Sequence, residues 1–278
     1  MRVKVAEHAG YCYGVERALK LTLEALNRLP KPICTLGPLI HNPQVVDSLE
    51  EKGVRAVSTL DEIDAGTVIV RTHGVDSRVI EEAKERGLRV VDATCPFVKK
   101  AQRCAAQLVA EGYHLVVVGE RDHPEVIGIL AHSGEGALVV ERVEDLSNLE
   151  DVQRAGVVVQ TTQSEENLKK IVSELLSVVG EVKIFNTVCD ATANRQKAAV
   201  QLAREVDVML VVGGKNSANT TRLAQLCRQI NPRTHHVETP SEIDPQWFFK
   251  DAFVGVTAGA STPDWILKKV AAKLATLS

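Results

Sequence analysis

The sequence predicts an α/β fold of three similar lobes, each with a parallel β-sheet covered by helices. Three observations lead to this prediction. A strand, a cysteine and a helix follow one another at three places along the chain. A second strand then ends in a glycine at a nearly constant distance from each cysteine, and a later strand with a polar exit precedes another helix. Strands that alternate with helices are typical of parallel sheets.

The first element of each unit is a strand that ends near a cysteine and leads into an amphipathic helix. The three segments are VKVAEHAGYCYGVERALKLTLEAL, LRVVDATCPFVKKAQRCAAQLV and VKIFNTVCDATANRQKAAVQLA, which contain Cys12, Cys95 and Cys189. The first two share the pattern C-x-x-V-x-[KR]-A. After the first cysteine, one helical face carries Val15, Ala18, Leu19, Thr22, Leu23 and Leu26.

The second element is a strand that ends in a glycine: ICTLG, LVVVG and MLVVG. Gly37, Gly119 and Gly213 lie 25, 24 and 24 residues after the preceding cysteine. Four residues beyond each glycine stands His41, His123 or Ser217, and a helix is expected to follow.

The third element is a strand with a short capped turn, and the fourth is a strand with a polar exit. ETPSEI resembles a capping box, with Thr239 before Pro240 and with Glu242 in the first turn, and TLDEI and VEDL occupy the matching places. The fourth strands are VIVRTHG, VVVQTTQS and VGVTAGAS. Helices are expected after them, for example over residues 79–86 and 265–275.

The ends of the chain predict how the lobes are completed. The third unit has no strand after its last helix, and the strand over residues 2–6 has no helix before it. We therefore expect the N-terminal strand to complete the third sheet and close a pseudo-threefold ring. The predicted lobes are residues 12–93, 94–187 and 188–278, the last completed by residues 1–11. The alternative is a generic α/β chain whose strands merely look alike, but four landmarks recur in one order at near-equal spacing.

Composition narrows the classes of function. The 278 residues are 45% hydrophobic and carry a net charge of −3, and no basic run or RNA-binding motif predicts a nucleic-acid partner. Apolar runs such as 115–118 are too short to span a membrane. The N-terminus lacks a secretory signal, so we expect a cytoplasmic protein. The six cysteines include no CxxC pair, which favours thiols that act as ligands or nucleophiles over disulfides or a zinc ribbon.

Three cysteines, one from each lobe, are expected to meet in a central cavity, because ligands bind outside the carboxyl ends of parallel strands. Three thiolates favour a soft metal or an iron–sulfur cluster at the centre of the ring. Three ligands on a four-iron cube would leave one iron open to substrate. The other cysteines are expected to be small buried hydrophobic residues: Cys34, Cys104 and Cys227.

A second set of polar residues occupies equivalent strand exits and suggests an anion site for a diphosphate or polycarboxylate. The set is His41, His73, His123, Ser217, Asn219 and Ser261. The remaining histidines are expected to be structural or exposed: His8, His114, His132, His235 and His236. Glu125 is a candidate acid, although a glutamate at a helix start can simply favour the helix dipole. Thr161 and Thr162 are candidates to orient Glu125 or a substrate hydroxyl.

Nine motifs, in order along the chain, resemble the 4-hydroxy-3-methylbut-2-enyl diphosphate reductase family of the non-mevalonate isoprenoid pathway. They are GYCYGV, GPLIHNPQVV, VRTHGV, DATCPFV, GERDHPEV, QTTQS, NTVCDATANRQ, GGKNSANTTRL and VTAGASTP. The resemblance covers essentially the whole chain. It implies one 4Fe–4S cluster held by Cys12, Cys95 and Cys189. It also implies that two electrons and two protons convert an allylic alcohol diphosphate to isopentenyl and dimethylallyl diphosphates and water.

The resemblance also implies roles for individual residues. The substrate hydroxyl would bind the open iron, with Glu125 as proton donor, Thr161 beside it and His123 in the same catalytic set. The diphosphate would be bound by His41, His73, His123, Thr161, Ser217, Asn219 and Ser261, and a ferredoxin or flavodoxin would supply electrons. Two positions depart from the family pattern: Ala218 replaces a second serine, and Tyr13 follows the first cysteine.

Two other readings are open from the residues alone. An iron–sulfur hydro-lyase would use the open iron without net redox change, and turnover without external electrons would identify it. An iron or redox sensor would need neither an acid at Glu125 nor the convergent His, Ser and Asn set, which therefore disfavours it.

Overall fold

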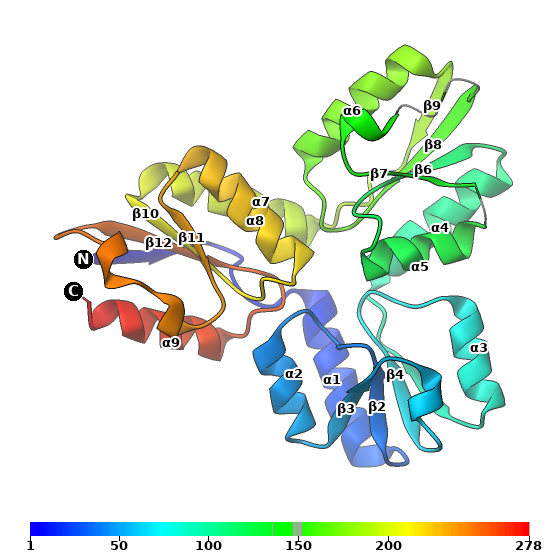
Figure 1. Ribbon diagram of the computed structural model, residues 1–278, viewed down its shortest axis with the longest axis horizontal. Coiled ribbons are helices and arrows are strands. Elements are labelled where there is room, and N and C mark those ends of the chain that lie inside the picture. Colours follow the sequence, from blue (N-terminus) through cyan, green and yellow to red (C-terminus); the bar gives the residue numbers. More distant parts are fainter. Residues whose placement is uncertain (135, 147–148, 150–151, 278) are drawn as a thin grey trace. The chain divides into compact units, whose positions relative to one another are not determined.

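The computed structural model describes residues 1–134, 136–146, 149 and 152–277, and within them the strands form three parallel sheets of four strands each (Figure 1). The strand orders are β3-β2-β4-β5, β7-β6-β8-β9 and β11-β10-β12-β1. When the strands of each sheet are numbered along the sequence repeat, with β1 taken as the last strand of the third sheet, all three sheets have the same strand order. The predicted fold class of three similar parallel-sheet lobes is confirmed.

The first sheet contains β2 (Ile33–Leu36), β3 (Val54–Val57), β4 (Thr67–Val70) and β5 (Arg89–Asp92). The helices of this part of the chain are α1 (Tyr13–Arg28), α2 (Pro43–Glu50) and α3 (Ser77–Glu85), with a 3₁₀ turn at Leu60–Glu62. The α3 helix begins before the predicted residue 79 because the Asp76 side chain accepts a hydrogen bond from the Arg78 N–H and caps it there.

The second sheet contains β6 (His114–Val118), β7 (Leu138–Val140), β8 (Arg154–Val159) and β9 (Glu181–Ile184). Its helices are α4 (Pro96–Ala110), α5 (Pro124–Ser133) and α6 (Glu165–Val178), with a 3₁₀ turn at Val143–Leu146. One face of the sheet packs against α4 and α5, through residues such as Leu108 and Ile129. The other face packs against α6, through Ile171 and Leu175.

The third sheet contains β10 (Val208–Val212), β11 (Thr234–Val237), β12 (Phe253–Ala258) and β1 (Arg2–Val5). Its helices are α7 (Asp190–Glu205), α8 (Ala218–Ile230) and α9 (Asp264–Ala275), with 3₁₀ turns at Pro240–Glu242 and Pro245–Trp247. β1 pairs in parallel with β12, with Arg2 opposite Phe253. The prediction that the N-terminal strand completes the third sheet is confirmed.

The central strands read as short apolar runs because helices cover both of their faces. All five residues of β10 and all four residues of β4 are buried. Burial of each Val or Leu side chain stabilises the fold by ~1.5–3 kcal/mol. The resulting rigid sheets fix the loops at their carboxyl ends, where the candidate residues lie.

The described chain divides into two compact units. One comprises Met1–Glu16, Ile40–Ser48 and Asp190–Ser278, and the other comprises Arg17–Leu39 and Leu49–Cys189. The first unit contains the β10–β12 sheet with β1, and the second contains the other two sheets. The ring and the three lobe boundaries at residues 12, 94 and 188 stay predictions. Every helix that the structure describes is too short or too polar to traverse a lipid bilayer.

Candidate active site

One backbone hydrogen bond recurs at all three strand-end cysteines. The N–H of Cys95 donates to the Thr72 carbonyl at 2.9 Å, and that of Cys189 donates to the Thr161 carbonyl at 3.1 Å. In the other unit, the Cys12 N–H donates to the Ala260 carbonyl at 3.2 Å. Each acceptor is the second residue after a strand, namely β4, β8 or β12. The repeat therefore holds the three cysteines in equivalent backbone positions.

Each of these cysteines stands where a helix begins. Cys95 is the N-cap of α4, and Cys12 and Cys189 directly precede α1 and α7. All three are half-buried, with no disulfide among them. The positive end of a helix dipole favours a negatively charged ligand atom, so the positions suit thiolates that bind a metal cluster. Partial exposure at strand ends and sulfur chemistry together fit an iron–sulfur group.

The other three cysteines lie inside hydrophobic cores. Cys34 and Cys227 are 0% exposed and Cys104 is 9% exposed. Burial raises the pKa of the Cys227 thiol to about 12, which leaves it protonated. The prediction that these cysteines are small buried hydrophobic residues is confirmed.

Glu125 is buried at the start of α5, with only 1% of its surface exposed. Its carboxylate accepts two hydrogen bonds from Thr161, one from the backbone N–H at 2.6 Å and one from Oγ1 at 2.8 Å. Burial raises the pKa of Glu125 to about 7, the Thr161 hydrogen bonds oppose that rise, and the charge of Glu120 adds to it. The carboxyl group is therefore close to half protonated at neutral pH.

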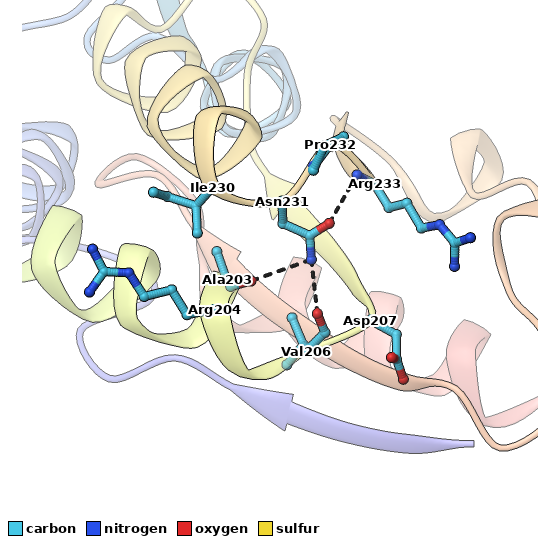
Figure 2. Close-up of a pocket in the computed structure, with 8 residues that line it drawn as sticks. All are labelled: Ala203, Arg204, Val206, Asp207, Ile230, Asn231, Pro232 and Arg233. Carbon is cyan, nitrogen blue, oxygen red and sulfur yellow. Dashed lines mark hydrogen bonds between the residues drawn. The ribbon is translucent and has the colours of Figure 1, made fainter.

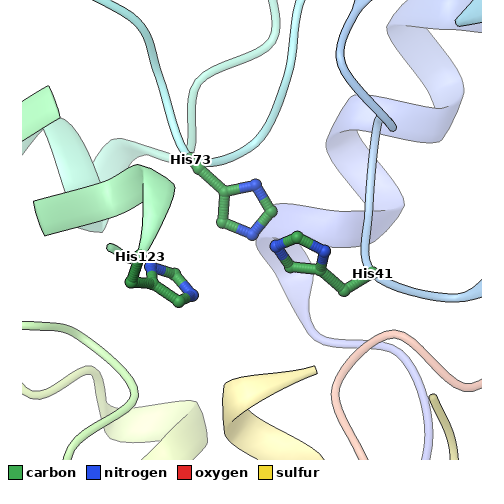
Figure 3. Close-up of side chains that lie close together, drawn as sticks. All are labelled: His41, His73 and His123. Atoms are coloured by element: carbon green, nitrogen blue, oxygen red, sulfur yellow. The ribbon is translucent and has the colours of Figure 1, made fainter. Parts of the chain in front are cut away.

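His123 caps α5 with its own side chain. Its Nδ1 accepts a hydrogen bond from the Glu125 N–H at 3.1 Å, so the ring proton is assigned to Nε2. His73 packs edge-to-face against it, with ring centroids 5.5 Å apart and ring nitrogens within 4.8 Å (Figure 3). The second unit thus brings together His73, His123, Glu125 and Thr161 at the carboxyl ends of β4, β6 and β8.

Thr162 does not contact the acid. Its Oγ1 accepts a hydrogen bond from Gln160 Nε2 at 2.9 Å, whereas Thr161 points to Glu125. Gln160 is 1% exposed, and its Oε1 accepts the Glu120 N–H at 3.0 Å. Gln160 was not among the residues predicted from the sequence. Gln160 directly follows a strand, as Arg71 and Gly259 do in the other sheets, and this position is the sequence feature from which it could have been predicted.

The first unit holds the remaining candidate anion-binding residues, of which Ser217, Asn219 and Ser261 follow β10 and β12 and His41 follows β2. Ser261 Oγ donates to the His41 carbonyl at 3.1 Å, and Asn42 Nδ2 donates to the Ser261 carbonyl at 3.0 Å. A Cβ at Gly214 would lie 2.7 Å from the His41 carbonyl oxygen, so this glycine lets the His41 backbone approach the loop before α8. His41 and Ser261 are therefore fixed beside that loop.

The start of α8 carries a buried donor. Ser217 is the N-cap and its side chain accepts a hydrogen bond from the Thr220 N–H. Asn219 is 6% exposed, and among the described residues its Nδ2 has no hydrogen-bond partner. A buried amide donor without a partner is costly unless a ligand satisfies it. This donor beside a helix N-terminus fits an anionic ligand. Ala218, where the helix begins, adds no hydroxyl.

A surface hollow on the same unit lies at the amino ends of the strands, at the opposite edge of the sheet from the candidate anion-binding residues (Figure 2). Its lining residues are Ala203, Arg204, Val206, Asp207, Ile230, Asn231, Pro232 and Arg233. Asn231 Nδ2 donates to the Ala203 and Val206 carbonyls at 3.4 and 2.9 Å, and its Oδ1 accepts the Arg233 N–H at 2.9 Å. These residues join the ends of α7 and α8 to the amino ends of β10 and β11, so they have a structural role.

The histidines other than His41, His73 and His123 have structural contacts or lie on the surface, as predicted. His132 Nδ1 lies 2.7 Å from the Gly128 carbonyl oxygen, and His236 Nε2 lies 2.9 Å from that of Gly213. His235 stacks on Trp247 with ring centroids 3.7 Å apart. His8 is exposed and His114 lies in β6.

Known proteins match the chain over nearly its whole length. The LytB protein family model matches residues 3–275. A relative from Pelobacter propionicus is 56% identical over 99% of this chain and 98% of its own, and one from Syntrophotalea carbinolica is 49% identical over the full length of both. Both are named 4-hydroxy-3-methylbut-2-enyl diphosphate reductase.

Two solved structures share the fold. One is of (E)-4-hydroxy-3-methyl-but-2-enyl diphosphate reductase, described as the terminal enzyme of the non-mevalonate pathway. It is 47% identical, with a TM-score of 0.73 over 99% of this chain and 100% of that one. The other, an E-1-hydroxy-2-methyl-but-2-enyl-4-diphosphate reductase from Plasmodium falciparum, is 27% identical, with a TM-score of 0.91 over 98% of this chain and 87% of that one. The family match, the relatives and the shared fold agree, and the chain belongs to the LytB protein family.

Proposed function

We propose that the protein reduces (E)-4-hydroxy-3-methylbut-2-enyl diphosphate to isopentenyl and dimethylallyl diphosphates. The reaction removes the hydroxyl as water and consumes two electrons and two protons. Its close relatives are named as reductases of this substrate over nearly the full chain. The observation that carries the proposal is the double role of Thr161. Its N–H and hydroxyl bind the buried Glu125 carboxylate, and its carbonyl accepts the Cys189 N–H.

The same proposal assigns Cys12, Cys95 and Cys189 to one 4Fe–4S cluster. When bound, such a cluster supplies single electrons and, with only three protein ligands, leaves one iron open to the substrate hydroxyl. The equivalent backbone positions of the cysteines and their helix-start placement support this assignment. Each turnover consumes two electrons that must be resupplied from outside the chain, and a ferredoxin or flavodoxin is the proposed source.

Glu125 is the proposed proton donor. A general acid must be protonated near neutral pH and still able to release its proton, which a pKa of about 7 allows. His123 is the rival, but its Nδ1 accepts a hydrogen bond from the Glu125 N–H, which leaves Nε2 as the ring nitrogen that can donate to a ligand. An Nε2–H donor suits the binding of an anion. The Thr161 hydroxyl, which donates a hydrogen bond to the Glu125 carboxylate, holds the carboxyl group in place for this proton transfer.

The diphosphate is assigned to the polar strand exits of the repeats. They offer imidazole, hydroxyl and amide donors, namely His41, His73, His123, Thr161, Ser217, Asn219 and Ser261. The buried Asn219 amide without a partner among the described residues supports an anion at this set. The helix starts at Ser217 and His123 add the favourable end of two helix dipoles.

Electron stoichiometry tests the proposed function. The protein is isolated without oxygen, its cluster is reconstituted, and it is mixed with reduced methyl viologen and the substrate. We expect two viologens to be oxidised for each isopentenyl or dimethylallyl diphosphate formed. Conversion of the substrate without viologen oxidation would instead identify a hydro-lyase. Viologen oxidation that is independent of the substrate would show that the protein is not this reductase.

A further inference from the structure

Arg71 occupies a position where the other two sheets have no cation. It directly follows β4, as Gln160 follows β8 and Gly259 follows β12. The side chain lies over Gly37, because a Cβ built on that glycine would approach Arg71 Nη1 to 2.6 Å. Gly37 directly follows β2, so the guanidinium group lies at the carboxyl edge of the first sheet.

The guanidinium group has no counter-charge within the described part of the chain. The buried Nε of Arg71 has no hydrogen-bond partner there, and no ion pair joins the side chain to a carboxylate. Burial lowers the pKa of Arg71, which shows that its surroundings disfavour the charge. A partly buried cation without a partner costs free energy that neither a hydrogen bond nor an ion pair offsets. An anion bound at this place would remove that cost.

The segment that carries Arg71 is held in place. Both the N–H and the hydroxyl of Thr72 donate to the Leu39 carbonyl, at 3.3 and 3.1 Å. The Gly74 N–H donates to the Arg71 carbonyl at 3.1 Å and turns the chain after His73. Arg71 is thus two residues from a candidate anion-binding histidine, on a fixed loop at the edge where parallel sheets bind ligands.

We propose that Arg71 is a further anion-binding residue, whose ligand is the diphosphate of the substrate. A guanidinium group offers paired N–H donors that match two phosphate oxygens, and its charge offsets that of the diphosphate. The identity of the ligand rests on the proposed function, whereas the binding of an anion by Arg71 does not. The competing explanation is that Arg71 only covers Gly37.

The two explanations predict opposite results for Arg71→Gln. If Arg71 binds the anion, the variant loses affinity for inorganic pyrophosphate by about 10- to 100-fold, the range for a hydrogen bond to a charged group. Its ligand-free melting temperature stays the same or rises, because a buried charge without a partner has been removed. If Arg71 only packs on Gly37, the melting temperature falls and the affinity is unchanged.

The experiment is calorimetric titration of pyrophosphate into the cluster-loaded protein without oxygen, with melting temperatures measured in parallel. Arg89→Gln is the matched control, since Arg89 is exposed at the amino end of β5 in the same sheet and should leave affinity unchanged. Arg71→Lys keeps the charge but not the paired donors, and should lose affinity by less than Arg71→Gln. It also decides the matter if Arg71→Gln does not fold, because an unchanged affinity in Arg71→Lys overturns the proposal.

Substrate turnover separates this inference from the proposed function. If pyrophosphate affinity depends on Arg71 but the wild type does not reduce the substrate, the anion site stands and the proposed reaction fails. If the wild type reduces the substrate and Arg71→Gln binds pyrophosphate as tightly as the wild type, the reaction stands and the role of Arg71 is rejected.

Discussion

At the scale of single residues, the proposed chemistry depends on the pair of Glu125 and Thr161. The carboxyl group is buried and would be unfavourable if charged, yet Thr161 stabilises the charged form with two hydrogen bonds. These opposing effects leave a pKa of about 7, which suits a group that gives up and regains a proton at neutral pH. Thr161 therefore lowers the pKa of this buried carboxyl group and also holds it in place.

Replacing Glu125 by Gln should slow turnover while leaving the cluster and substrate binding intact. The amide keeps the size of the side chain but has no acidic proton, so we expect a loss of about 10²–10⁴-fold in kcat. Steady-state rates with a strong artificial reductant, with iron content checked, measure this. His123→Asn serves as the comparison, because it should raise KM as well. A wild-type rate for Glu125→Gln would place the acid elsewhere.

The buried carboxyl also makes stability depend on pH. Its pKa is raised from 4.5 to about 7, so between these values the folded chain keeps a proton that the unfolded chain releases. This contribution to stability is complete below about pH 4.5 and is lost as pH rises to about 7, by about 3 kcal/mol at most. Glu125→Gln should therefore melt at progressively higher temperature relative to wild type from pH 5 to pH 8. A constant gap in melting temperature would contradict the assignment.

A substitution at Ala218 tests whether the start of α8 binds the diphosphate. If its missing hydroxyl weakens the anion site, Ala218→Ser should tighten diphosphate binding by at most ~1.5–3 kcal/mol, and by less where water already takes its place. Titration with pyrophosphate measures the change, and Ala218→Gly controls for altered backbone freedom. A loss of affinity in the serine variant would mean that the loop has adapted to alanine.

The sequence indicated Glu125 and Thr161 as candidate residues, but it did not indicate which threonine donates hydrogen bonds to the carboxylate. Adjacent side chains at a strand exit point in different directions, so only the structure distinguishes Thr161, which contacts the acid, from Thr162, which contacts Gln160. Arg71 could not be predicted as a candidate either, because the lack of a hydrogen-bond partner for its side chain among the described residues depends on packing. Motifs locate polar exits, whereas three-dimensional contacts decide which side chains are satisfied.

At the scale of elements, alternation of apolar strands with helices predicted every sheet, because parallel strands covered on both faces read as short apolar runs. The short capped turn at ETPSEI was also predicted correctly. Glu242 accepts the Glu238 N–H at 3.2 Å, and Pro240–Glu242 forms a 3₁₀ turn with Thr239 as its N-cap. A capping pattern indicates where a turn begins, but the following Asp244 and Pro245 start a separate turn and limit its length.

The packing of α8 against the exit of β12 depends on Gly259. A Cβ there would lie 1.9 Å from Thr220 Oγ1, so we expect Gly259→Ala to destabilise the fold by ~1–3 kcal/mol. Gly180→Ala is the control, since the nearest atom to its added Cβ is 3.5 Å away. Chemical denaturation measures both. Equal stability of the two variants would show that α8 moves freely to accommodate the methyl group.

At the scale of the whole chain, one pattern of backbone hydrogen bonds is used three times. The N–H groups of Gly37, Gly119 and Gly213 donate to the last residues of β3, β7 and β11, at 2.6, 3.0 and 2.9 Å. The N–H groups of the three strand-end cysteines also donate to equivalent carbonyls, each in the second residue after a strand. The number of sheets and the sheet to which the N-terminal strand belongs followed from the sequence repeat. The strand order and the grouping into two compact units did not, since they depend on contacts between segments that no periodicity encodes.

Iron content in a series of cysteine variants tests the central claim most directly, that three equivalent cysteines hold one 4Fe–4S cluster. Wild-type protein prepared without oxygen should be brown and contain about four irons per chain. Replacement of Cys12, Cys95 or Cys189 by Ser should abolish assembly, whereas the same change at Cys34, Cys104 or Cys227 should leave the iron content unchanged. A colourless wild type that reduces the substrate at full rate with zinc in place of iron would contradict the account.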